Sequence, residues 1–66
     1  VDGLDYYRRI IKDAFKYVNG YGSYLILEIG SSLAEDVIKI LEENNWKNIE
    51  VFTDLSGLDR MIIAEI

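Results

Sequence analysis

Glu28 is the residue of this chain whose type and position point most directly to chemistry. It ends the apolar run Tyr24-Leu25-Ile26-Leu27 and is the only charge in that segment. If the run is a strand, Glu28 lies at its carboxyl end, where ligands gather in open α/β sheets. The alternative is a solvated carboxylate, or one paired with a nearby base. Glu28 is therefore the candidate pocket residue.

A second candidate is the segment Gly30-Ser31-Ser32, which precedes a helical pattern. Free N–H groups at a helix N-terminus can bind an anion. Ser32 and Glu35, however, have the spacing of a capping box, in which two side chains satisfy such donors. Because capping is the commoner role of such a serine, we expect Ser32 to cap the helix rather than to bind an anion.

Asp54, Asp59 and Arg60 form a third cluster, near the end of the sequence. Two neighbouring carboxylates can act as acid and base or hold a hard metal ion. An adjacent arginine more often fixes a loop through charge-assisted hydrogen bonds, and we expect that structural role here. We predict no metal-binding residue within this chain.

Basic side chains recur in the first segment at Arg8, Lys12 and Lys16, a spacing that places them on one helical face. Such a face could meet an acidic partner or RNA. Aspartates lie near this basic face at a spacing that allows ion pairs. The chain as a whole has 12 acidic and 7 basic residues, which give it a net charge of −5. We therefore expect a solvated face with local ion pairs and no direct binding of nucleic acid.

The composition of the 66 residues excludes several classes of site. The absence of Cys excludes disulfides, thiolate ligands and cysteine nucleophiles, and the absence of His removes the commonest metal ligand and general base. Half of the residues are apolar, which is too many for a disordered chain. Uninterrupted apolar runs are short and no signal peptide is visible, so we expect a cytoplasmic protein without a membrane span.

Five elements must position these residues. Each is predicted from the period of its apolar residues, and turn-forming residues separate it from the next. The predicted elements are a helix over residues 3–18 that is ended by residues 19–22, a strand at 24–29, a helix over 32–44, and strands at 49–53 and 60–66.

This order, helix-strand-helix-strand-strand, predicts a two-layer α/β fold with a C-terminal antiparallel hairpin. We expect residues 1–66 to form a single partial domain, with both helices on one face of a three-stranded sheet. Odd-numbered residues of the strand 24–29 should face one side and even-numbered residues, Glu28 among them, the other. The second face then has no cover within the chain, which indicates a missing piece or a partner.

Three motifs carry a resemblance to a known family. They are Asp-Gly-Leu-Asp-Tyr-Tyr-Arg-Arg-Ile at residues 2–10, Leu-Glu-Ile-Gly at residues 27–30, and Asp-Leu-Ser-Gly-Leu-Asp-Arg at residues 54–60. In this order they resemble the C-terminal end of the release factor glutamine methyltransferases, the HemK or PrmC family. Together they span essentially the whole chain.

The resemblance implies the end of a class I, Rossmann-like methyltransferase domain, which binds S-adenosylmethionine on a seven-stranded sheet. In that fold the seventh strand inserts antiparallel between the fifth and sixth, so residues 60–66 would be central and residues 24–29 an edge. The family's Gly-rich cofactor loop is absent, and without any Pro its catalytic Asn-Pro-Pro-Tyr is absent too. The chain alone is therefore expected to bind no cofactor and to be inactive.

The resemblance also implies the partners of this chain. They would be the rest of the methyltransferase domain and, for the intact enzyme, a peptide-chain release factor whose glutamine amide Glu28 would help to bind. The alternative from another class is a stand-alone, non-enzymatic α/β module for dimerisation or binding. If the chain folds alone, the strand at residues 24–29 becomes an unprotected sheet edge, which predicts self-association by edge pairing or by packing of sheet faces.

Overall fold

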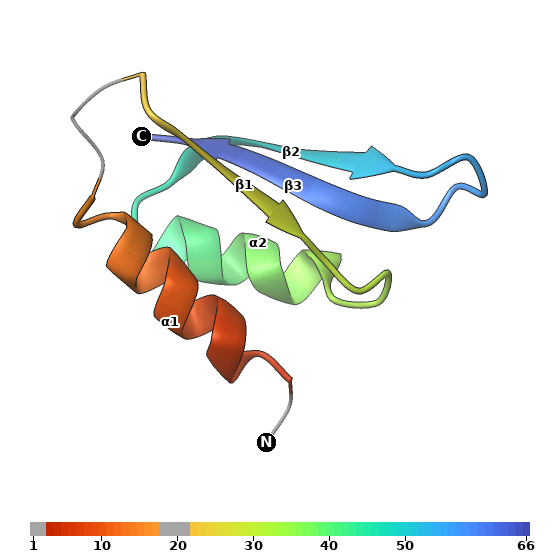
Figure 1. Ribbon diagram of the computed structural model, residues 1–66, viewed down its shortest axis with the longest axis horizontal. Helices are drawn as coiled ribbons and strands as arrows, with labels where there is room; N and C mark the ends of the chain where they lie inside the picture. Colours follow the sequence, from red (N-terminus) through yellow and green to blue (C-terminus); the bar gives the residue numbers. More distant parts are fainter. Residues whose placement is uncertain (1–2, 18–21) are drawn as a thin grey trace.

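The computed structural model describes residues 3–17 and 22–66. Two helices and three strands follow one another along the chain (Figure 1): α1 (Asp5–Ala14), β1 (Tyr24–Glu28), α2 (Ala34–Glu43), β2 (Lys47–Thr53) and β3 (Asp59–Glu65). The predicted order of elements is thereby confirmed. Neither of the helices that the structure describes is long and apolar enough to cross a membrane.

Helix α1 forms because its apolar side chains recur on one face, so that Leu4, Tyr7 and Ile11 are buried. The helix is shorter than predicted. It ends at Ala14, and the chain continues in a tighter turn with hydrogen bonds between residues three apart. Residue 18 of the predicted helix and most of its predicted stop, residues 19–21, lie outside the described residues. Gly22 has the left-handed φ of 92° that suits a glycine in a turn.

The start of α2 corrects the predicted capping box. The helix begins at Ala34, and its N-cap residue is Leu33, which makes no side-chain hydrogen bond to the helix. Ser32 therefore lies one residue too early for its hydroxyl to reach the free N–H groups of the first turn. The cause is the preceding turn, in which the Leu33 N–H donates to the Gly30 carbonyl over 3.0 Å and so determines where helical backbone begins.

The end of α2 lies where it was predicted, at a Schellman motif. Asn45 adopts a left-handed backbone with a φ of 67°, and the Trp46 N–H donates to the Leu41 carbonyl over 3.0 Å. This reversal returns the chain to the core, where Trp46 is 3% exposed. Its ring and that of Phe15 form a T-shaped pair with the ring centroids 5.6 Å apart.

The strands form one antiparallel sheet in the order β1-β3-β2. The predicted hairpin and the central place of the last strand are both confirmed. β2 begins at Lys47 rather than at residue 49, and its register against β3 shifts between Lys47 and Glu50 and again between Phe52 and Thr53. β1 pairs with β3 without any shift, from Tyr24 to Glu28.

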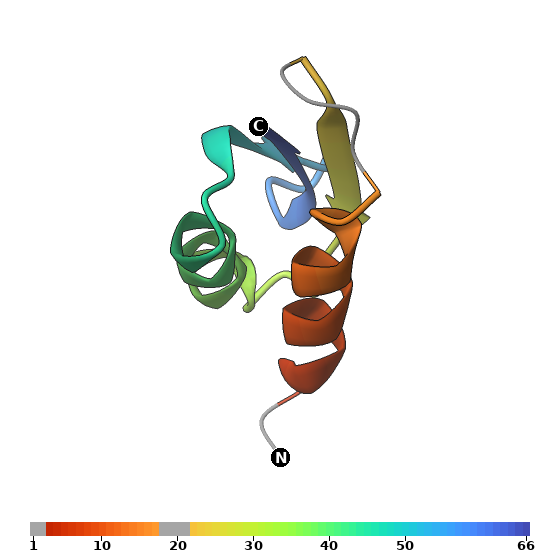
Figure 2. The ribbon, with the colours of Figure 1, turned by 90° about the vertical axis from the view of Figure 1, so that its left-hand side faces the viewer.

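Both helices lie on one side of the sheet, as Figures 1 and 2 show. On that side Leu27, Ile29, Ile62 and Ala64 are buried against the apolar faces of the helices. The opposite side of the sheet is covered by no described residue, and its apolar side chains are exposed or half-buried. They are Tyr24, Ile26, Phe52, Met61 and Ile63. We call these five residues the free face. The predicted arrangement of the two sheet faces is confirmed.

Candidate functional site

The candidate site is the carboxyl end of β1, where Glu28 meets the turn into α2. Glu28 pairs with Met61 of β3, so its side chain shares the free face, as the alternation of the strand predicts. The side chain is exposed, and within residues 3–17 and 22–66 its carboxylate forms no ion pair. A nearby basic partner is thus not part of the described structure. The carboxylate stands open to a donor from outside.

The backbone of Glu28 is held by α1. The hydroxyl of Tyr7 donates a hydrogen bond of 3.1 Å to the Glu28 carbonyl oxygen, across 21 positions of sequence. Tyr7 is itself 8% exposed, so the bond sits at the margin of the core. The period of apolar residues that predicts the first helix gives no sign of this bond. The one available signal was chemical, because a buried tyrosine hydroxyl usually finds a partner.

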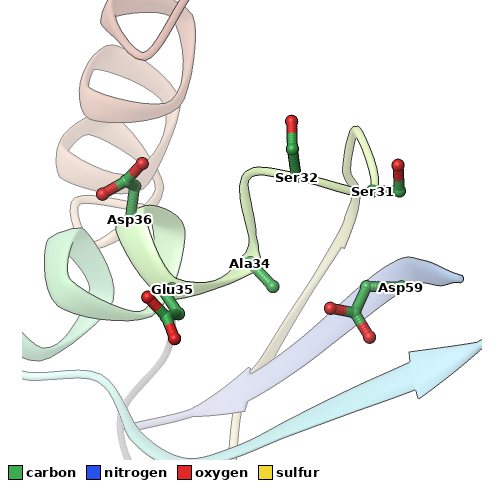
Figure 3. A pocket seen from close by; sticks show the side chains of 6 residues that line it. All are labelled: Ser31, Ser32, Ala34, Glu35, Asp36 and Asp59. Carbon is green, nitrogen blue, oxygen red and sulfur yellow. The ribbon is translucent and has the colours of Figure 1, made fainter.

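A hollow of about 270 Å³ lies beside this strand end, around the first turn of α2 (Figure 3). Three carboxylates and two hydroxyls surround it, and Asp59 faces it from the start of β3. Its lining residues are Ser31, Ser32, Ala34, Glu35, Asp36 and Asp59. Glu28 is not among them. The structure therefore does not bring the predicted pocket residue into this hollow.

The charges around the hollow decide what it can hold. No basic side chain lines it, so an anion placed there would meet carboxylates at short range. The anion alternative for residues 30–32 thereby loses its electrostatic support. Among the residues that the structure describes, no three side chains of the metal-binding types lie close enough together to hold a metal ion. The arrangement is that of an acidic, solvated surface depression.

Asp54 has the structural role expected of its cluster. Its Oδ1 accepts the N–H groups of Ser56 at 2.8 Å and Leu58 at 3.0 Å, and its Oδ2 accepts Arg60 Nε at 2.9 Å. The hydrogen bond from Arg60, followed by that from Leu58, lowers the pKa of the Asp54 carboxyl below its usual range. Asp59 does not join this network and faces the hollow instead.

The basic face of α1 is a solvated surface, as predicted. Arg8 Nη1 lies 2.8 Å from Asp5 Oδ1, and Lys16 Nζ lies 3.7 Å from Asp13 Oδ1. All four side chains are about half or more exposed, and such pairs contribute little to stability. Local ion pairs thus account for much of the charge on this helix.

Comparison with known proteins identifies what the chain resembles. No protein-family model matches it, and no solved structure matches it significantly. Release factor glutamine methyltransferases do match. The protein of Fusobacterium nucleatum is 45% identical over 64 residues, that of Thermodesulfovibrio yellowstonii 41% identical over 64, and that of Clostridium acetobutylicum 40% identical over 63.

These matches cover 96–97% of this chain but only 18–23% of the relatives. The chain thus spans about a fifth of the length of the proteins that it resembles. The matched region is the C-terminal part of the relatives, in agreement with the three motifs at residues 2–10, 27–30 and 54–60. The chain is therefore similar, over nearly its whole length, to the C-terminal part of release factor glutamine methyltransferases.

Proposed function

We propose that this chain is the C-terminal structural portion of an S-adenosylmethionine-dependent methyltransferase that modifies a glutamine of peptide-chain release factors. The observation that carries the proposal is the similarity of 40–45% identity along almost the entire chain to proteins of that name. The partners in this proposal are the rest of the methyltransferase domain and, for the intact enzyme, a release factor.

The sheet supports this assignment in its topology. A Rossmann-like domain that ends in an inserted antiparallel strand would have the order β1-β3-β2, with the last strand in the centre. The free face supports it as well, because strands with apolar side chains on both faces are typical of sheets covered on both sides. In the proposed parent, the preceding part of the domain covers the free face and pairs with the open edge of β1.

The residues present do not fit S-adenosylmethionine. The hollow next to α2 has Ala34 as its one apolar lining residue and is ringed by Glu35, Asp36 and Asp59. An adenine ring would find no apolar wall there, and the carboxylate of the cofactor would meet like charges. We therefore assign no step of the reaction to this hollow. Cofactor binding and catalysis belong to the remainder of the proposed parent, and the chain alone is expected to be inactive.

Glu28 has a defined role in the proposal. An amide nitrogen is a poor nucleophile, and a carboxylate that accepts a hydrogen bond from the amide N–H can hold it in position. The Glu28 carboxylate stands exposed at the carboxyl end of β1, and Tyr7 fixes the backbone from which it projects. Glu28 would thus form part of the wall of the glutamine pocket.

The experiment that tests the assignment is to read the gene upstream of Val1. A frame that continues upstream through a Gly-rich loop and an Asn-Pro-Pro-Tyr motif supports the methyltransferase. A start codon just before Val1 contradicts it and favours a stand-alone α/β module. In the upstream-extended enzyme, Glu28→Gln should lower kcat/KM for release-factor methylation, whereas Glu50→Gln, an exposed change on β2, should leave it unchanged.

The second candidate, a dimerisation or binding module, is favoured by the apolar free face and by the open edge of β1. It predicts that the 66-residue chain folds and self-associates without any other protein. A cytoplasmic location and the absence of direct nucleic-acid binding remain predictions in both cases. The second of these agrees with the net charge of −5.

A further inference from the structure

The peptide unit that follows Glu28 is held from both of its sides. Its N–H, that of Ile29, donates to the Arg60 carbonyl of β3 over 2.9 Å. Its C=O, that of Glu28, accepts the hydroxyl of Tyr7 over 3.1 Å. A trans peptide is planar and its C=O and N–H point in opposite directions. The two bonds therefore fix the orientation of the peptide plane at the carboxyl end of β1.

The hydroxyl of Tyr7 supplies the half of this arrangement that the sheet does not. Ile29 bonds to β3, and the direction of the bonds alternates along an antiparallel strand, so the N–H and C=O groups of Glu28 point away from β3. The sheet therefore offers the Glu28 carbonyl no partner. Among the described residues, the Tyr7 hydroxyl alone donates a hydrogen bond to this carbonyl.

Tyr7 can hold another group in place because its own ring is fixed. Its residue is 8% exposed and belongs to the same buried cluster as Leu4 and Ile11, on one face of α1. The ring also forms a T-shaped pair with that of Tyr6, with the ring centroids 5.4 Å apart. Figure 2 shows α1 on the β1 side of the helix layer. The hydroxyl thus reaches the strand end from a packed and rigid base.

We propose that Tyr7 is a positioning residue of the glutamine pocket and acts through the backbone of Glu28. This role rests on the proposed function and adds a residue to it. Tyr7 approaches β1 from the helix side, whereas the Glu28 side chain shares the free face with Met61, so Tyr7 itself does not touch the substrate. Its hydroxyl fixes the peptide plane, the plane fixes the direction in which the Glu28 carboxylate projects, and the carboxylate holds the substrate amide.

The direction of the Glu28 side chain matters because a carboxylate that orients an amide must meet it at a defined place. A small displacement of a group that holds a reactant can lower a rate by an order of magnitude or more. The Glu28 carboxylate forms no ion pair among the described residues, so the described structure restrains this residue through its backbone. Loss of the Tyr7 hydroxyl should therefore affect the reaction through Glu28.

The test is a double-mutant cycle in the upstream-extended enzyme, with a release factor as substrate. Tyr7→Phe should lower kcat/KM by about tenfold, and the dissociation constant of S-adenosylmethionine should not change. Glu28→Ala removes the carboxylate that Tyr7 positions. In that background Tyr7→Phe should lower kcat/KM by no more than about twofold. Tyr6→Phe removes an exposed hydroxyl from the same helix and is the matched control, which should keep the wild-type kcat/KM.

Two outcomes would overturn the role of Tyr7 while the methyltransferase assignment stands. One is a Tyr7→Phe enzyme with the wild-type kcat/KM. The other is an equal loss from Tyr7→Phe with and without the Glu28 carboxylate, because a purely structural Tyr7 would act independently of that group. Thermal unfolding of each variant sets an assay temperature at which all of them are folded. An extended wild-type enzyme that methylates no release factor would instead overturn the proposed function, and the role of Tyr7 with it.

Discussion

The two faces of the sheet have nearly the same chemistry and opposite surroundings. On the helix side, Ile62 and Ala64 of β3 are 0% exposed, and Leu27 of β1 is 7% exposed. On the free face, Tyr24 and Ile26 of the same β1 strand are 63% and 61% exposed. The apolar pattern of a strand therefore shows which of its faces are suited to burial. It does not show whether the chain itself supplies the residues that bury them.

The difference teaches where the stability of the chain comes from. Two short helices can cover one face of three strands, and the burial there supplies the folding free energy. The free face contributes little until something binds to it. A domain of this size has only marginal stability. Substitutions on the covered face and on the free face should therefore differ clearly in how far they lower the free energy of unfolding.

The largest effect is expected from the covered face of the central strand. Ile62→Ala should lower the free energy of unfolding by about 2–5 kcal/mol, because it removes a fully buried side chain and leaves a cavity. Ile63→Ala is the matched control, one residue away on the other face, and should cost roughly 1 kcal/mol or less. Urea denaturation at low protein concentration measures both. Equal losses would contradict the distinction between the faces.

The next effect concerns the bond that joins the helix layer to the strand end. Tyr7→Phe removes the hydroxyl that donates to the Glu28 carbonyl and should cost about 1 kcal/mol. Tyr6→Phe is the control, since Tyr6 is 66% exposed and its ring contact with Tyr7 persists in either variant. The same denaturation assay applies. If Tyr7→Phe were as silent as Tyr6→Phe, α1 would not restrain the end of β1.

The sequence predicted the architecture well because the architecture follows from periodicity. Three local patterns each indicate a single structure. They are the apolar residues on one face of α1, the alternation of side chains between the two faces of β1, and the short connection between β2 and β3. The place of the last strand came from the resemblance to a family, and the pairing of β3 with both neighbours confirmed it. The free face was predicted from the same patterns.

The details of the site were harder to predict because they depend on geometry that no spacing encodes. Ser32 and Glu35 have the spacing of a capping box, yet the turn at Gly30 starts the helix one residue too late for it. The bond from Tyr7 joins residues that are 21 positions apart. The acidic hollow is lined both by Asp59 and by the first turn of α2. These residues are far apart in the sequence and lie close together only in the folded chain.

A smaller effect, visible as a dependence on pH, is expected from the loop between β2 and β3. The pKa of Asp54 is lowered in the folded chain by Arg60, so the folded state favours the charged carboxylate. The resulting stability is fully present above the unfolded aspartate pKa of about 3.9 and is lost as the pH falls through the lower folded value. In Asp54→Asn, the free energy of unfolding should therefore fall less steeply as the pH is lowered from neutral to acidic values. Denaturation curves measured over that pH range test this.

Asp13→Asn is a suitable control for that experiment, because the contact of the Asp13 carboxylate among the described residues is a long, exposed one with Lys16. In Asp13→Asn, the free energy of unfolding should fall with acidic pH as it does in the wild type. If the free energy of unfolding of Asp54→Asn fell with acidic pH as steeply as that of the wild type, the stability of the loop between β2 and β3 would not depend on the ionised carboxylate.

The smallest effect is expected on the free face, from Ile26→Thr. The change keeps a β-branched side chain on the strand and removes apolar surface that is already exposed to water, so stability should shift by no more than about 0.5 kcal/mol. Leu27→Thr, the next residue on the covered face, should cost several times more because it buries a hydroxyl in the core. If the two variants instead lost similar stability in the monomer, the free face would already be covered within a single chain. An open second face would then no longer explain why this strand is apolar on both sides.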